Sequence, residues 1–184
     1  AGAVRSAGFS PDGRWIVYTS ANPARSGIWK IHPDGTEATH LLKGAINNAE
    51  VSPDGRWVSF LDSTTVRLRV ITLADGVDVP AVDFPMLGVG LGGTAITIGR
   101  SRWINASTLA WVDYDTEARA TRLVAQEIVP GRDTRAGRRV LLQGTPDDMP
   151  ESFGVSPDGR RLVVSSIRNR SNILLIEGLP GVLR

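Results

Sequence analysis

Three aspartates recur in one short motif and are the first candidates for chemistry in this sequence. The motif is S-P-D-G-R, and its copies contain Asp12, Asp54 and Asp158. Carboxylates at repeated positions could bind a metal ion or a substrate if the fold brought them together. A repeat, however, distributes its copies around a scaffold. We therefore favour a structural role in tight turns, where aspartate accepts hydrogen bonds from nearby backbone N–H groups.

The neighbours of each aspartate support this interpretation. Gly13, Gly55 and Gly159 directly follow the aspartates, and glycine adopts a positive φ at little cost. The proline before each aspartate cannot donate a hydrogen bond to a strand ladder, so it ends the preceding strand. We predict that each S-P-D-G segment is a turn between two antiparallel strands.

Few other residues have the types and spacing that chemistry needs. The segment GVGLGG at 88–93 fits the dinucleotide-binding pattern G-x-G-x-x-G, but a strand-like segment follows it where such a site needs a helix N-terminus. The two histidines, His32 and His40, lack a third ligand to complete a metal set. Cysteine is absent, and no G-x-S-x-G nucleophile elbow occurs. We therefore expect a protein that is not an enzyme and has no cofactor and no metal.

The composition is that of an ordinary soluble domain. Hydrophobic residues make up 41% and charged residues 22% of the 184 residues. The 21 basic and 19 acidic residues give a net charge of +2, which provides no electrostatic footprint for nucleic acid. No run of apolar residues approaches the length of a membrane span. We expect no nucleic acid partner and no direct insertion into a membrane.

The motifs also define a repeat. Ser52 follows Ser10 by 42 residues, and Ser156 follows Ser52 by 104 residues, which is twice 52. This spacing predicts a degenerate copy near position 104, where the segment WINASTLAWVDY begins at Trp103. We align Ile104 of this segment with Ser10 of the first motif, which gives four copies of the repeat in the chain.

This alignment assigns Leu109 and Trp111 of the third copy to the positions of Trp15 and Val17 in the first. Each motif precedes a run of β-branched and aromatic residues, then a polar loop and a second such run, which is typical of strands. We expect both faces of the strand after each motif to be buried between neighbouring units. The core residues expected on this basis are Trp15, Ile16, Tyr18, Trp57, Val58 and Phe60.

Many short strands at this period are typical of β-propeller blades, each a four-stranded antiparallel sheet. The sequence therefore predicts an all-β chain that forms about four blades of a β-propeller. The expected blades are approximately 3–44, 45–86, 94–144 and 150–184.

Residues 9–20 (FSPDGRWIVYTS) and 28–35 (IWKIHPDG) resemble the WD-like repeat of TolB-type β-propellers. The segment RVITLADG at 69–76 is a looser match to the second half of that repeat, and the resemblance is thin over 87–145. Residues 151–182 also look like the end of the propeller attached to some bacterial serine/threonine kinases. TolB-type propellers typically have six or more blades, so the resemblance implies that these blades are part of a larger propeller. The alternative is a stand-alone ring of four blades.

Function is then expected at surface loops rather than at the repeated motif, because loops on a rigid scaffold commonly carry binding. The leading hypothesis is a non-catalytic protein-interaction or sensory module of a larger bacterial protein, with a protein or peptide partner. The alternative is the propeller domain of a prolyl oligopeptidase-like serine peptidase without its hydrolase domain. The resemblance favours a periplasmic or other extracytoplasmic location, and the oligomeric state stays open. The candidate partner-binding residues are Asn22, Arg25, Asn48, Glu117, Arg119, Arg168 and Arg170.

Overall fold

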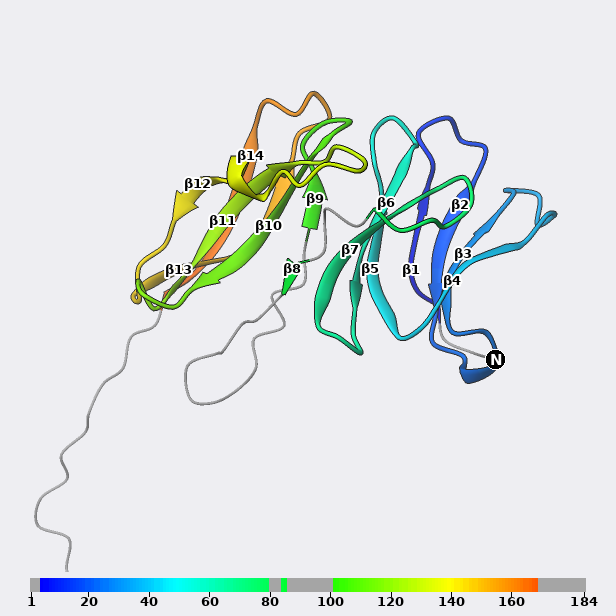
Figure 1. The fold of residues 1–184 in the computed structure, drawn as a ribbon, viewed down its shortest axis with the longest axis horizontal. Coiled ribbons are helices and arrows are strands. Elements are labelled where there is room, and N and C mark those ends of the chain that lie inside the picture. The colour runs from blue at the N-terminus through cyan, green and yellow to red at the C-terminus, as the bar shows by residue number, and fades with distance from the viewer. Residues whose placement is uncertain (1–3, 80–83, 86–100, 169–184) are drawn as a thin grey trace, which may run out of the picture.

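The computed structural model describes residues 4–79, 84–85 and 101–168, and these form four antiparallel sheets (Figure 1). The first sheet contains β1 (Val4–Phe9), β2 (Ile16–Ser20), β3 (Gly27–Ile31) and β4 (Thr39–Lys43). The second sheet contains β5 (Ile46–Val51), β6 (Trp57–Asp62), β7 (Arg67–Thr72) and β8 (Phe84–Pro85). The third sheet contains β9 (Ser101–Trp103), β10 (Thr108–Asp115), β11 (Ala120–Glu127) and β12 (Arg139–Gln143). The fourth sheet contains β13 (Asp148–Val155) and β14 (Leu162–Arg168).

Each sheet is a meander, in which consecutive strands pair as hairpins. The first strands of the four sheets, β1, β5, β9 and β13, lie next to one another in chain order. The S-P-D-G turns after β1, β5 and β13 therefore lie at one edge of the molecule, and the β2–β3, β6–β7 and β10–β11 loops lie at the opposite edge (Figure 1). We call the first the turn edge and the second the loop edge. Short 3₁₀ helices in the described loops are Pro23–Arg25 and Arg135–Gly137.

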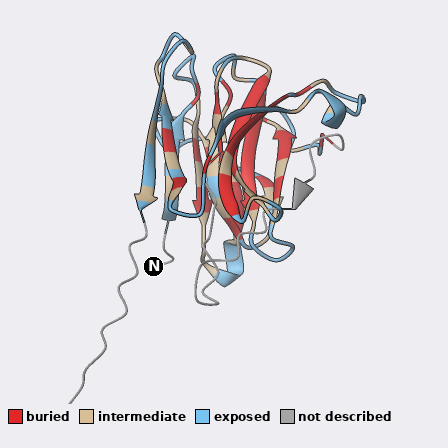
Figure 2. Cartoon of the chain, turned by 90° about the vertical axis from the view of Figure 1, so that its left-hand side faces the viewer, coloured by how far each residue is buried: buried red, intermediate tan, exposed pale blue. Residues whose placement is uncertain are grey.

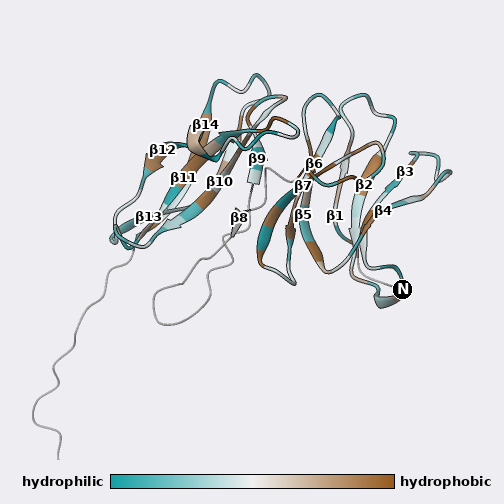
Figure 3. Ribbon diagram, in the orientation of Figure 1, coloured by the Kyte–Doolittle hydropathy of each residue, from teal (hydrophilic) through white to brown (hydrophobic). Residues whose placement is uncertain are grey.

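The central strand β6 shows why the sheets stack. Its residues WVSFLD are almost entirely buried, on both faces of the sheet. Val58 and Phe60 pack on Val17 and Ile28 of the first sheet. Trp57 and Leu61, which point to the other face because side chains alternate along a strand, pack in a separate cluster with the third sheet. Figures 2 and 3 show that the buried and hydrophobic residues follow the strands, whereas most turns are exposed and polar.

The third sheet differs from the sequence alignment by one residue. Ile104 N–H donates to the carbonyl oxygen of Thr108 at 2.8 Å, whereas Ser10 N–H donates to that of Trp15 at 2.8 Å. Thr108, and not Leu109, is therefore equivalent to Trp15. The turn is one residue shorter because Asn105 replaces the S-P-D-G chemistry: its Oδ1 accepts hydrogen bonds from the backbone N–H groups of Ser107, at 2.9 Å, and Thr108, at 2.8 Å.

The consequence of this difference is a change of face. A one-residue shift in a strand moves every side chain to the other side of the sheet. Leu109 and Trp111 therefore pack on Trp57 of the second sheet. Ala110 and Val112 point the other way and pack with Phe153 of the fourth sheet.

The core prediction was correct for the second sheet and wrong for the first. Trp57, Val58 and Phe60 are buried, at 7%, 0% and 0% exposure. Trp15, Ile16 and Tyr18 are only partly buried. The buried hydrophobic residue of this strand is instead Val17, which is 3% exposed. The physical reason differs between these residues: Trp15 borders a cavity, and Ile16 and Tyr18 lie on a sheet face that no other described sheet covers.

We call this uncovered side of the first sheet the open face. Cross-strand pairs define it, because directly paired residues share a face: Phe9 pairs with Ile16, Ile16 with Ile31, and Tyr18 with Trp29. Phe9 is 65% exposed. In the second and third sheets the equivalent pairs are Val51 with Val58 and Trp103 with Leu109, and they pack against the preceding sheet.

Candidate functional site

The aspartates of the motif are engaged in their own turns. Ser10 Oγ donates a hydrogen bond to Asp12 Oδ1 at 2.6 Å, and Arg14 N–H donates to the same oxygen at 3.1 Å. The same pair of contacts recurs at Asp54, from Ser52 and Arg56, and at Asp158, from Ser156 and Arg160. Gly13, Gly55 and Gly159 have φ values of 69°, 72° and 69°.

These hydrogen bonds also set the charge state of the turns. The hydroxyl of Ser10, followed by the backbone N–H of Arg14, lowers the pKa of Asp12 below its ordinary value. Ser156 and Arg160 lower the pKa of Asp158 in the same way. At Asp54 burial opposes ionisation, but the contacts from Ser52 and Arg56 outweigh it, and the pKa is again lowered.

Two of the sequence-predicted binding residues, Asn22 and Arg25, come together at the loop edge. Asn22 Oδ1 caps the 3₁₀ helix Pro23–Arg25 by accepting a hydrogen bond from Ala24 N–H at 3.0 Å. The guanidinium of Arg25 lies 4.6 Å above the ring of Trp29, whose other neighbour, His40, stacks on it at 4.2 Å. Trp29 Nε1 donates back to the carbonyl oxygen of Arg25 at 2.9 Å.

These residues border a small surface pocket of about 210 Å³, which we call the rim pocket. Its walls combine an arginine, a tryptophan and a tyrosine with polar groups from the β2–β3 loop. The lining residues are Val4, Tyr18, Ser20, Asn22, Arg25 and Trp29.

The remaining predicted residues lie apart from the rim pocket. Glu117 and Arg119 are exposed in the β10–β11 turn, where Arg119 has a φ of 51°. Arg168 ends β14, and its Nε donates to Asp148 Oδ2 at 2.9 Å. Arg170 lies outside the described residues, as does the segment GVGLGG at 88–93.

Asn48 differs from its predicted place in a loop. It lies within β5, is exposed and has a φ of 53°. The pairing of β5 with β6 shifts register between Asn47 and Glu50. A β-bulge of this kind inserts one extra residue into a strand, and nothing in the sequence NNAEV marks its position.

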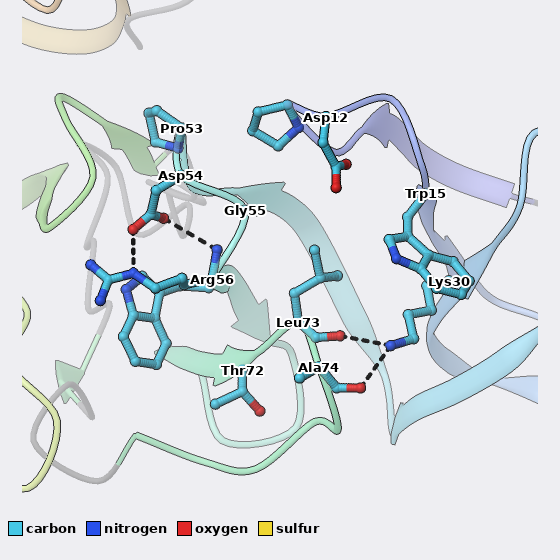
Figure 4. Close-up of a pocket in the computed structure, with 12 residues that line it drawn as sticks. Asp12, Trp15, Lys30, Pro53, Asp54, Gly55, Arg56, Thr72, Leu73 and Ala74 are labelled. Carbon is cyan, nitrogen blue, oxygen red and sulfur yellow. Dashed lines mark hydrogen bonds and ion pairs between the residues drawn. The ribbon is translucent and has the colours of Figure 1, made fainter.

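The structure also contains a larger cavity that the sequence did not predict. It has a volume of about 650 Å³ and lies at the turn edge between the first and second sheets (Figure 4). The two S-P-D-G turns approach each other above it, since a Cβ on Gly55 would lie 3.6 Å from Pro11 Cδ. We call it the inter-sheet cavity; it is lined by Pro11, Asp12, Trp15, Lys30, Pro53, Asp54, Gly55, Arg56, Trp57, Thr72, Leu73 and Ala74.

One signal in the sequence could have pointed to this cavity. Lys30 interrupts the apolar strand GIWKI at a position that alternation assigns to a buried face. It is 8% exposed. Its Nζ crosses to the second sheet and donates to the carbonyl oxygens of Leu73, at 3.0 Å, and Ala74, at 2.6 Å.

Among the described residues, no three His, Asp or Glu side chains come close enough to hold a metal ion. Within the same residues, no helix is long and apolar enough to cross a membrane.

Solved structures similar to this chain are β-propeller proteins. A prolyl endopeptidase structure has a TM-score of 0.65 and 15% sequence identity, over 92% of this chain and 25% of that chain. The β-propeller domain of Cps50 (Swd1) from Myceliophteria thermophila has a TM-score of 0.56 and 12% identity over 90% of this chain and 50% of that one. A putative TolB from Agrobacterium tumefaciens has a TM-score of 0.52 and 18% identity over 79% of this chain and 50% of that one.

The chain has the β-propeller fold. It spans a quarter to a half of the length of these three structures, so its sheets correspond to part of a propeller of that size. No family model matches the chain, and no curated protein sequence matches it. At identities of this level, the likeness concerns the fold and not the activity.

Proposed function

We propose that this chain is a non-catalytic, protein-binding segment of a β-propeller, and that its partner docks at the rim pocket. The observation that carries the proposal is the composition of that pocket. Arginine, tryptophan and tyrosine are the residues most enriched among the energetic hot spots of protein interfaces. Arg25, Trp29 and Tyr18 border one pocket at the loop edge.

The contacts around Arg25 favour binding because they hold its side chain in place before a partner arrives. The stacking on Trp29 and the capped 3₁₀ helix restrict Arg25 and its loop. A pre-ordered side chain loses less conformational entropy on association, which leaves more of the contact energy for affinity. A sensory role in a larger bacterial protein, as in the TolB-type resemblance, would use the same surface.

The test is the replacement Arg25→Glu in the full chain. A partner is first captured from extracts of the source cells with the wild-type protein. The affinities of wild type and variant for the captured partner are then measured. Arg14→Glu is the matched control, because Arg14 is also exposed but lies at the turn edge. We expect Arg25→Glu to weaken binding by about tenfold or more, as for a hot-spot residue. A partner bound equally well by both variants would contradict the proposal.

The second candidate, a propeller domain of a prolyl oligopeptidase-like peptidase, predicts a hydrolase domain elsewhere in the same protein. Its nucleophile would lie in a G-x-S-x-G elbow. Discovery of such a domain in the full reading frame would favour this candidate. Turnover of peptide or ester substrates by residues 1–184 alone would contradict both proposals, because each assigns no catalytic residue to this segment.

A further inference from the structure

The inter-sheet cavity has a buried positive charge in its wall. Lys30 is 8% exposed, and its ammonium lies 4.7 Å from the ring centre of Trp15. Among the described residues it forms no ion pair with a carboxylate. An ammonium has three N–H donors, and the carbonyl oxygens of Leu73 and Ala74 use two of them. Buried charges are normally paired, and the charge of Lys30 acts on Asp75, whose pKa it helps to lower after the larger effects of Thr72 and Val77. One N–H donor of the ammonium is left for a ligand.

A hydrogen-bond acceptor borders the same cavity. Asp12 uses Oδ1 in its turn, and its Oδ2 forms no hydrogen bond among the described residues. Asp54 differs, because Arg56 Nε occupies its Oδ2 while Ser52 and the Arg56 N–H occupy Oδ1. Figure 4 shows the carboxylate of Asp12 and the ammonium of Lys30 on the walls of one space between the two sheets.

The rest of the wall is suited to an apolar group. Pro11, Pro53, Trp15 and Leu73 contribute apolar surface. A volume of about 650 Å³ falls within the range of roughly 300–1,000 Å³ that is usual for small-ligand sites, which combine apolar walls with a few placed polar groups. The cavity therefore offers a cation, an acceptor and an apolar space.

We propose that the inter-sheet cavity binds the C-terminal residue of a peptide. The terminal carboxylate accepts the spare N–H of Lys30, the apolar side chain packs on Trp15 and Leu73, and the last amide N–H donates to Asp12 Oδ2. A C-terminal residue carries these three groups on one Cα. The site lies at the turn edge, whereas the rim pocket lies at the loop edge, so this inference does not rest on the proposed function.

The test uses N-acetyl-leucine as a probe for a peptide C-terminus, with binding followed by calorimetry and by the fluorescence of the cavity tryptophans. N-acetyl-leucinamide lacks the negative charge, and hexanoate lacks the amide N–H. We expect N-acetyl-leucine to saturate the site with a Kd of about 1 mM or below. N-acetyl-leucinamide and hexanoate should each bind at least about tenfold more weakly than N-acetyl-leucine.

Three variants assign the binding to this cavity. Lys30→Met should weaken N-acetyl-leucine binding about tenfold or more, whereas Lys43→Met, at an exposed position of β4, should leave it unchanged. Asp12→Asn should reduce the preference for N-acetyl-leucine over hexanoate. Lys30→Met removes two hydrogen bonds between the sheets, so circular dichroism must show that this variant still folds. Ala74→Phe is an independent test, because it keeps Lys30 and places a large side chain in the cavity.

The outcomes that overturn the proposal are distinct. Absence of saturable binding, equal binding of the acid and the amide, or unchanged binding in both Lys30→Met and Ala74→Phe would show that the cavity is not a carboxylate site. Equal affinity for hexanoate and N-acetyl-leucine would overturn the peptide assignment and favour a simple organic acid instead.

Discussion

A serine hydroxyl holds the carboxylate of each S-P-D-G turn, and this contact makes the stability of the turns depend on pH. The hydrogen bond from Ser10, and then that from Arg14 N–H, lower the pKa of Asp12 from its ordinary value of 3.8. A carboxyl group whose pKa is lowered by folding stabilises the folded state above the unfolded pKa, and this stability is lost as the pH falls through the folded pKa.

The variant Ser10→Ala should therefore be less stable than wild type at neutral pH, and the difference should shrink as the pH falls below 3.8. Urea denaturation at a series of pH values measures this difference directly. Part of the loss is independent of pH, because Ser10 Oγ also accepts a hydrogen bond from Trp15 N–H. A difference that stays constant from neutral to acidic pH would contradict the role assigned to Asp12.

The glycines of two turns have the same backbone angle but different surroundings. Gly13 and Gly159 both have a φ of 69°, and a Cβ on Gly13 would meet no atom within 4 Å. A Cβ on Gly159 would lie 2.4 Å from the carbonyl oxygen of Ile104.

Gly13→Ala should cost about 1–2 kcal/mol of unfolding free energy, from backbone strain alone. Gly159→Ala should cost more, because the third sheet must move away from the turn. Chemical denaturation of both variants compares the two costs, and equal losses would mean that the fourth sheet does not pack on Ile104 as described.

At the scale of the strand, the two tryptophans that follow the first two motifs have different environments. Trp57 is 7% exposed and packs in the cluster between the second and third sheets. Trp15, at the same place in the repeat, is only partly buried at the edge of the inter-sheet cavity.

Trp57→Ala should therefore destabilise the fold by about 3–5 kcal/mol, the usual cost of truncating a buried tryptophan. Trp15→Ala should cost clearly less. Thermal unfolding followed by circular dichroism tests the pair, and the reverse order of stability would contradict the described packing.

The strands show what sequence can and cannot predict. The S-P-D-G turns and the alternating runs after them were predictable, because proline, aspartate and glycine each restrict the backbone locally. The third turn was not, since Asn105 closes it with one residue fewer and no S-P-D-G signal. The bulge at Asn48 depends on how two strands pair, and no local pattern marks it. The inter-sheet cavity depends on how two sheets pack, and its one local signal is Lys30 within the apolar strand GIWKI.

At the scale of the molecule, the open face of the first sheet is the main departure from a closed stack. Phe9, Ile16, Tyr18 and Trp29 belong to it through their cross-strand pairs. The equivalent faces of the other sheets are covered by the sheet before them in the chain. We infer that another propeller blade covers the open face around Phe9 and Ile16 in a larger propeller, whereas Tyr18 and Trp29, which border the rim pocket at the loop edge, stay open to a partner. This inference agrees with the partial length of the chain relative to similar propellers.

The central claim, that this chain is an open segment of a larger propeller, is tested most directly by the solvent exposure of Phe9. Hydroxyl-radical footprinting should label Phe9, which is 65% exposed, in residues 1–184 alone and should find it protected in the full-length protein. Phe60, which is 0% exposed, is the matched control and should be protected in both. Protection of Phe9 in the isolated segment, or equal labelling of Phe9 in both proteins, would contradict the claim.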